Sequence, residues 1–165
     1  MNMKRELDDI EIVKVYIDDI KDIFNKFDYE DISDELALYI ENRCSRTTKN
    51  KLCIKIFVDK DLTSAEKDSV VTAIRAHYGL EKKYLEVETE KLKRVNICYF
   101  VAGLLTILAG ILLPLGNYIP EVIDVLGGFM IYESASNLLF TDNELDLKSY
   151  RAIKISKAKI EFEKK

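Results

Sequence analysis

The sequence has few of the residues that build metal centres, disulfide frameworks and nucleophilic active sites. Its 165 residues include only three cysteines and one histidine. An odd number of cysteines without paired spacing predicts neither a disulfide framework nor a zinc site. There is also no P-loop, no dinucleotide-binding fingerprint and no nucleophile elbow. We therefore expect no cofactor, no bound metal and no catalytic residues, and nothing favours an enzyme over other classes of protein.

Charged residues are missing from the segment Val95 to Leu113. A helix that crosses the hydrocarbon core of a bilayer needs about 20 apolar residues, so this segment is long enough to span a membrane. Its Val, Ile, Leu and Phe side chains outweigh the one polar amide near its start, Asn96. The alternative is a buried helix of a soluble protein.

A second segment, Glu121 to Phe140, is long enough to return across the membrane but contains Asp124 and Glu133. One acidic residue near the middle of a helix costs about 2.5–3.5 kcal/mol on insertion scales. The connection from Pro114 to Pro120 is rich in turn-forming residues, which favours a tight antiparallel return. We therefore predict a transmembrane hairpin over 95–140, with spans at about 95–113 and 121–140.

Basic residues flank this hairpin on both sides, and its connecting loop has none. The positive-inside rule then places both termini in the cytoplasm, and the protein in the bacterial cytoplasmic membrane. The N-terminus has no apolar core of a signal peptide, so we expect no cleaved leader. Residues 1–62 carry a net negative charge, which argues against a nucleic-acid partner. The basic flanks are Lys82, Lys83, Lys91, Lys93 and Arg94 before the hairpin and Lys148, Arg151, Lys154, Lys157 and Lys159 after it.

The remaining chain predicts a small cytoplasmic α/β domain of two or three strands with flanking helices. Strands are expected at 11–17, at 51–60 in a central position covered on both faces, and at the tail 157–162. Long crossovers connect them, which favours a partly parallel sheet. We expect residues 1–94 to form this domain with its juxtamembrane helix. Residues 141–165 are expected to add a helix and a strand that pack back on it.

Capping signals predict the helix boundaries. A short helix is expected after Asp18 or Asp19, and Ser33 is expected to cap a helix that ends near Arg46. Thr63 and Glu66 form a capping box. Gly79 is predicted to end that helix as a left-handed cap, before a further helix from Glu81. The sequence Thr-Asp-Asn at 141–143 predicts a break after the second span.

One polar face of the second span is the main candidate for function. An ionisable group within a span is a functional-site hypothesis by default, which singles out Glu133. Gly127, Ser134 and Asn137 fall within about 120° of it on a helix. This face would hold a proton- or ion-responsive carboxylate or line an oligomeric pore. The alternative is a packing role, with the carboxylate bonded to Asn137 or Thr106 or close to the aqueous interface.

In the first span, Gly103, Thr106 and Gly110 form a stripe of small residues. Small residues let the backbones of two membrane helices approach closely. We therefore expect these three residues to pack the two spans of the hairpin together rather than to mark a specific dimer motif.

The order of segments resembles a family of small, uncharacterised prokaryotic two-span membrane proteins. The resemblance rests on the segment DDIKDIFNKFD (18–28), the aromatic-Glu pair Tyr132-Glu133, and the basic tail that ends in AKIEF (158–162). That family usually has Trp-Glu at the pair, so Tyr132 departs from it. The resemblance implies the two-span topology and carries no activity.

These observations favour a non-enzymatic membrane module that senses or scaffolds. Its expected partners are the lipid bilayer, a cytosolic protein and further copies of the chain. A second hypothesis is an oligomeric channel or membrane-permeabilising effector that uses Glu133, and a third is an enzyme at the membrane surface. The sequence by itself does not decide among them.

Overall fold

The computed structural model describes residues 10–46, 49, 51–112 and 119–165. The described chain is mostly helical, with one small parallel sheet and one long apolar helix. Contacts divide the chain into an α/β unit, residues 1–83 and 149–165, and a hairpin unit, residues 84–148. The α/β unit thus ends within a helix at residue 83, earlier than the predicted domain boundary at residue 94.

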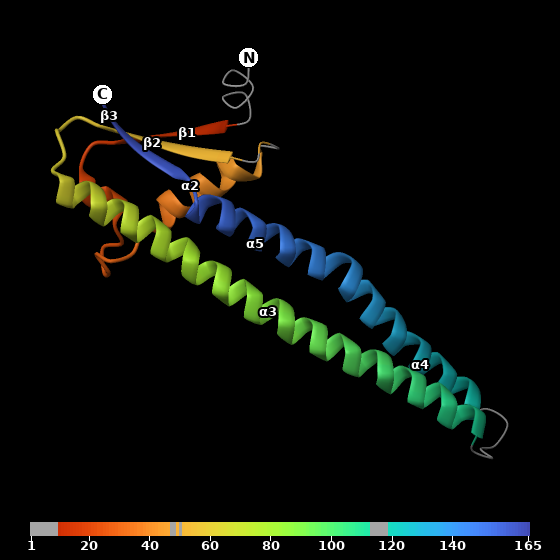
Figure 1. The fold of residues 1–165 in the computed structure, drawn as a ribbon. Helices are drawn as coiled ribbons and strands as arrows, with labels where there is room; N and C mark the ends of the chain where they lie inside the picture. Colours follow the sequence, from red (N-terminus) through yellow and green to blue (C-terminus); the bar gives the residue numbers. More distant parts are fainter. Residues whose placement is uncertain (1–9, 47–48, 50, 113–118) are drawn as a thin grey trace. The chain divides into compact units, whose positions relative to one another are not determined.

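The sheet consists of β1 (Ile10–Ile17), β2 (Lys51–Val58) and β3 (Lys159–Lys164) in the order β1-β2-β3 (Figure 1). Both strand pairs are parallel. The prediction that the second strand is central and that the tail adds a third strand is therefore confirmed. The sheet is parallel throughout rather than in part, because helical crossovers connect every pair of consecutive strands.

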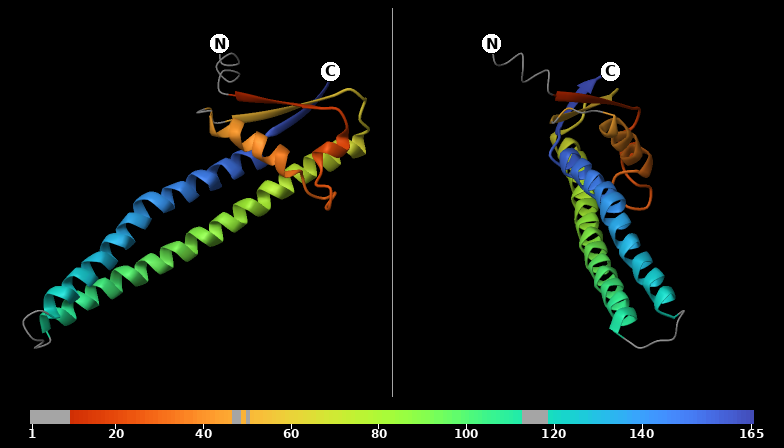
Figure 2. Two further views of the ribbon diagram at one scale, coloured as in Figure 1. Left: turned by 180° about the vertical axis from the view of Figure 1, so that it is seen from behind. Right: turned by 90° about the vertical axis from the view of Figure 1, so that its right-hand side faces the viewer.

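The helices of the α/β unit lie on one face of this sheet (Figures 1 and 2). They are α2 (Asp34–Ser45), the first part of α3 (Ser64–Leu112) and the last turns of α5 (Asp142–Ser156). Alternate strand residues point into the core against these helices. The core residues with no exposed surface are Ile23, Ile32, Ile40, Ile54, Ile56, Val70, Ile74, Tyr78 and Ile155.

The other face of the sheet is open within the α/β unit. Ile12 and Tyr16 on β1 are exposed, and the ring of Tyr16 stacks on Phe57 of β2 with centroids 4.8 Å apart. Parallel sheets are usually covered on both faces, and the near-continuous apolar run of β2 predicted such a two-sided position. That prediction is wrong within the α/β unit, and the open face is only partly apolar because Lys55 and Glu161 pair on it.

The predicted caps are confirmed. The Ser33 hydroxyl accepts a hydrogen bond from the Leu36 N–H, and α2 follows. Thr63 and Glu66 bond each other reciprocally, at 2.8 Å from the Thr63 N–H to the Glu66 carboxylate, and α3 follows. The short helix after Asp19 is the 3₁₀ helix η1 (Ile20–Ile23). In each case a short polar side chain satisfies backbone N–H groups that a helix start leaves free.

The prediction that Gly79 ends a helix is wrong. Helix α3 continues without a break from Ser64 to Leu112, and no described glycine has a positive φ. Tyr78 and Leu85 are both buried, so packing continues on each side of the glycine. A Cβ at Gly79 would meet nothing within 4 Å, which makes this glycine an ordinary exposed helix position.

The hairpin unit contains the second part of α3, α4 (Ile119–Ser136), the π-helix η2 (Asn137–Thr141) and the start of α5. The predicted break at residues 141–143 is wrong, because the helix passes through η2 directly into α5. A π-helix adds a residue per turn and disturbs the normal carbonyl pairing. The side-chain amide of Asn143 donates to the Leu139 carbonyl at 2.5 Å and satisfies one of these carbonyls.

Among the described residues, α3 is the one helix long and apolar enough to cross a membrane. Only 17 % of the most apolar 18-residue stretch of this helix is buried. Helix α4 is not such a helix, because it contains three acidic residues, Glu121, Asp124 and Glu133. Leu113 and most of the predicted turn from Pro114 to Pro120 lie outside the described residues. The structure therefore contains one candidate span, and the second span stays a prediction.

Candidate functional site

The four residues predicted to form one polar face around Glu133 differ in burial. Gly127 and Ser134 are buried, whereas Glu133 and Asn137 are half-buried. The Ser134 hydroxyl donates to the backbone carbonyl of Asn96 on α3 at 2.8 Å. Two of the four predicted residues thus lie in the contact between α3 and α4.

The predicted small residues of α3 lie in the same contact. A Cβ at Gly103 would lie 2.8 Å from the Gly127 carbonyl oxygen, and one at Gly127 would lie 2.6 Å from Cγ1 of Ile107. Gly110 faces Ile123 and Asp124. The helices therefore approach so closely at Gly103 and Gly127 that side chains do not fit between them. This geometry is typical of close packing between membrane helices.

Thr106 does not bond Glu133. Its hydroxyl donates to the Ala102 carbonyl of its own helix at 2.8 Å. Within the described ranges, the Glu133 carboxylate has neither a hydrogen bond nor an ion pair. Because the residue is half-buried, part of its surface stays open to the surroundings of the hairpin.

The sequence analysis did not identify Thr89 and Asn96 as interior residues. Together with Ser134 they are the buried polar residues of the described chain. The Asn96 side chain has no exposed surface, and its amide makes no hydrogen bond to any described residue. The sequence does contain one signal that these residues are interior. Thr89, Asn96, Gly103 and Gly110 follow one another at intervals of seven residues, which marks one seam of a packed helix.

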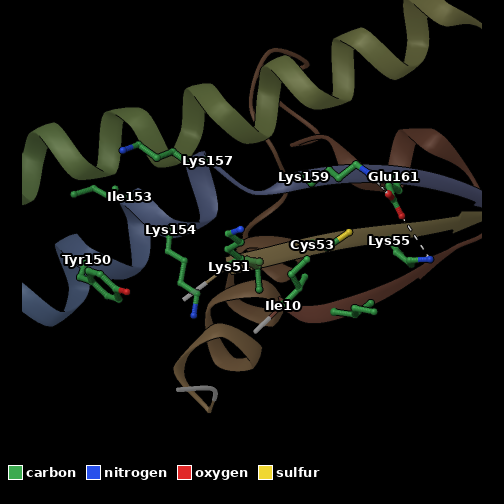
Figure 3. Close-up of a pocket in the computed structure, with 12 residues that line it drawn as sticks. Ile10, Lys51, Cys53, Lys55, Tyr150, Ile153, Lys154, Lys157, Lys159 and Glu161 are labelled. Atoms are coloured by element: carbon green, nitrogen blue, oxygen red, sulfur yellow. Dashed lines mark ion pairs between the residues drawn. The ribbon is translucent and has the colours of Figure 1, made fainter. Parts of the chain in front are cut away.

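A pocket in the α/β unit is the second candidate site, with a volume of about 670 Å³ (Figure 3). It lies beside the first residues of the strands and the last turns of α5. Figure 3 shows Tyr150, Ile153 and Lys154 on α5 at one side and Cys53 and Lys55 on β2 at the other. The remaining lining residues are Ile10, Ile12, Lys51, Leu52, Lys157, Lys159 and Glu161.

The strand side of this pocket is neutralised by ion pairs. Lys55 bonds Glu163 and lies 3.5 Å from Glu161, and Lys159 lies 2.6 Å from Glu161. The hydrogen bond from Lys159 lowers the pKa of Glu161, and the bond to Glu163 raises the pKa of Lys55. All of these groups are therefore charged and paired near neutral pH.

The α5 side of the pocket keeps an excess of positive charge. Lys154 donates to the backbone carbonyl of Lys49, which holds the side chain in place without cancelling its charge. Lys157 is exposed and has no carboxylate partner within the part of the chain that the structure describes. The charges of Lys154 on α5 and of Lys157 in the turn that follows it thus remain available to an anion.

Cys53 at the floor of the pocket is not an activated nucleophile. Its side chain is largely buried, and burial followed by the nearby Glu161 raises the pKa of the thiol. The thiolate is the reactive form of cysteine, so this residue is largely unreactive at neutral pH. The pocket therefore offers apolar surface and positive charge rather than an activated thiol.

The acidic segment from Asp18 to Glu35 uses its carboxylates within the fold. No cluster of three potential metal ligands occurs among the described residues. Asp28 and Asp31 accept hydrogen bonds from nearby backbone N–H groups, and Asp31 also lies 2.8 Å from His77. These carboxylates order the loop between η1 and α2.

Comparisons with protein-family models, with curated proteins and with solved structures found no match to this chain. The resemblance to small prokaryotic two-span membrane proteins therefore stays a prediction. Any function must be argued from the two candidate sites and from the surfaces of the two units.

Proposed function

We propose that the chain is an integral membrane protein whose α3 and α4 form a hairpin in the bilayer and whose α/β unit lies in the cytoplasm. The observation that carries this proposal is the apolar outer surface of the hairpin unit. Exposed side chains on α3 include Leu104, Leu105, Leu108, Ile111 and Leu112, and those on α4 and η2 include Val122, Val125, Leu126, Phe129 and Phe140.

Water is a poor solvent for this surface. Leaving one such side chain exposed, rather than buried, costs about 1.5–3 kcal/mol. Soluble monomers rarely expose so large a continuous apolar surface. Lipid would cover all of it at once, and the close approach of Gly103 and Gly127 supports association of two helices in lipid. The packing of α4 on α3 also supports insertion of the more acidic α4.

The side of the membrane on which the termini lie is inferred from the distribution of basic residues. Basic residues precede and follow the hairpin, and residues 95–147 contain neither lysine nor arginine. The positive-inside rule supports a cytoplasmic location for both termini and so for the α/β unit. A membrane-anchored domain with an open, partly apolar sheet face and an unactivated thiol in its pocket suits a module that senses or scaffolds. A cytosolic protein and other copies of the chain are its proposed partners.

A second candidate function is an oligomeric channel. It is favoured by Glu133, which is half-buried and unbonded among the described residues. Against it, Gly127 and Ser134 of the same face are used for packing between α3 and α4. Ion flux in vesicles that contain the protein, abolished in Glu133→Gln but kept in Glu121→Gln, would favour the channel over the sensing module.

Membrane extraction with a topology reporter tests the main proposal. After an alkaline carbonate wash, the full chain should stay in the membrane pellet, and a reporter fused to either end should report from the cytoplasm. The variant Leu105→Lys, which places a charge on the exposed side of α3, should reduce insertion, whereas Leu80→Lys in the α/β unit should not. Release of the unmodified chain by carbonate would refute membrane insertion, and a reporter outside the cell would refute the sidedness.

A further inference from the structure

We infer that the pocket of the α/β unit binds a single-chain anionic amphiphile, such as a long-chain carboxylate or an alkyl phosphate. The inference goes beyond the proposed membrane topology and does not depend on it. It rests on an apolar floor, on unpaired cations on one side, and on a volume of about 670 Å³. This volume lies within the range of about 300–1,000 Å³ found for small-molecule sites.

The floor supplies the apolar contact for an alkyl chain. Ile12 and Cys53 are register partners on adjacent strands and share the open face of the sheet. Ile10 extends this floor at the start of β1, and Tyr150 and Ile153 on α5 line the pocket beside the first residues of the strands. Each of these five residues lines the pocket directly.

The cations decide the sign of the ligand's charge. Five lysines and one glutamate line the pocket. The glutamate, Glu161, is engaged by Lys55 and Lys159, so it attracts no further cation. Lys154 lies on α5 and Lys157 in the turn that follows it, and both line the pocket. Their side chains point in different directions (Figure 3), so a carboxylate or phosphate group could approach either charge without displacing an existing ion pair.

The combination favours an amphiphile over other anions. Inorganic phosphate would leave the isoleucine floor in contact with water, and an uncharged chain would leave the two lysines unused. A nucleotide would find only one aromatic side chain, Tyr150, for its base among the lining residues. An amphiphile with one anionic end and one alkyl chain contacts both the isoleucine floor and the lysines.

Cys53 provides a local readout of occupancy. Its thiol lies in the floor, so a bound chain should shield it from alkylation, whereas Cys98 lies in the hairpin unit and serves as an internal control. The full chain is placed in nanodiscs of phosphatidylcholine, and alkylation by iodoacetamide is followed by peptide mass spectrometry. A pH of about 8.5 raises the thiolate fraction of Cys53, so that its alkylation rate can be measured.

We expect laurate and dodecyl phosphate to slow alkylation of Cys53 about tenfold and to leave the rate at Cys98 unchanged. The double variant Lys154→Gln, Lys157→Gln should need about tenfold more laurate for the same protection. Lys83→Gln, an exposed lysine of the same unit away from the pocket, should behave like the unmodified chain. Circular dichroism checks that each variant is folded. If the double variant is not folded, the single variant Lys157→Gln replaces it, because the Lys157 side chain makes no bond to the described residues and only its backbone N–H donates, to Ile153.

Four results would overturn the inference. They are no protection by laurate, equal protection by dodecyltrimethylammonium, equal protection by inorganic phosphate, and protection only when the nanodiscs contain phosphatidylglycerol. The last would assign the pocket to a bilayer lipid headgroup. Each result is independent of carbonate extraction, so failure of the membrane proposal and failure of this inference are distinguishable.

Discussion

The two units of the chain have opposite interiors. The α/β unit buries isoleucine, valine and leucine and exposes charged side chains around much of its surface. The hairpin unit buries Thr89, Asn96 and Ser134 beside Leu85 and Leu145, and its described residues between 95 and 140 expose leucine, isoleucine, valine and phenylalanine. One chain thus contains one unit with an apolar interior and another whose central segment is apolar on the outside.

This difference supports our proposal that the two units are folded for two solvents. In water, burial of apolar surface drives packing, so the apolar residues gather in the core. In lipid, that driving force is absent, and helices associate through close backbone approach and hydrogen bonds. The hydrogen bond from Ser134 to the Asn96 carbonyl and the Gly103–Gly127 contact are such interactions. The following changes test the comparison, from the largest expected effect to the smallest.

Truncation in the apolar core should have the largest effect on the α/β unit. Ile54 on the central strand has no exposed surface, so Ile54→Ala should lower the free energy of unfolding by about 2–5 kcal/mol. Ile12→Ala on the neighbouring strand, where the side chain is 49 % exposed, should cost well under half as much. Urea unfolding in mild detergent, followed by circular dichroism, measures both, and equal losses would mean that the open sheet face is covered.

Enlarging a contact glycine should disrupt the hairpin. In Gly127→Leu the new side chain meets the Gly103 carbonyl and Ile107, and overpacking of this kind costs about 1–3 kcal/mol. Gly128→Leu is the matched control, because a Cβ there meets nothing within 4 Å. Thermal unfolding in detergent should show a lower Tm for the first variant only. A similar decrease in both would show that glycine itself, not the contact, matters.

Removing the unbonded amide from the seam should stabilise the hairpin. Asn96→Leu replaces a buried amide that has no described partner by an apolar group of similar size, and the Ser134 bond to the backbone is kept. An unsatisfied buried polar group costs about 1–3 kcal/mol, so Tm should rise. The half-buried Asn137→Leu should change Tm less. A lower Tm for Asn96→Leu would show that its amide is bonded in the assembled protein.

Acid should weaken the capping box at the start of α3 by a small amount. The backbone and hydroxyl hydrogen bonds from Thr63 lower the pKa of Glu66 from its ordinary value of 4.5. A lowered pKa in the folded state means that the stabilisation is present above 4.5 and is lost as the pH falls through the folded value. The Tm advantage of the unmodified chain over Glu66→Gln should therefore be largest at neutral pH and vanish in acid. Glu88→Gln should show no such trend.

Much of the α/β unit was predictable because its signals are local. The caps at Ser33 and Thr63, and the alternating or continuous apolar runs of β1 and β2, each depend on residues a few positions apart. The errors at Gly79 and at residues 141–143 have a different origin. There, long-range packing of Tyr78 and Leu85, and a side-chain bond from Asn143, override the local tendency to end a helix.

The two candidate sites were predictable to different degrees. Seven-residue spacing along α3 and the polar face of α4 are visible in the sequence, although Thr89 and Asn96 were not identified from it. The pocket was not predictable, because its lysines come from β2 and from the end of α5 through β3, segments that lie about 100 residues apart in the chain. In the sequence, Lys154, Lys157 and Lys159 indicated only the orientation of the hairpin.

The most direct test of the central claim is the solvent at the middle of α3. A nitroxide label at Leu105→Cys, in a variant whose three native cysteines are replaced by alanine, reports its surroundings by electron paramagnetic resonance in lipid vesicles. We expect greater accessibility to oxygen than to a water-soluble nickel complex, and the reverse for a label at Tyr84→Cys on the same helix. Greater accessibility of the Leu105→Cys label to the nickel complex would contradict the placement of the hairpin in lipid.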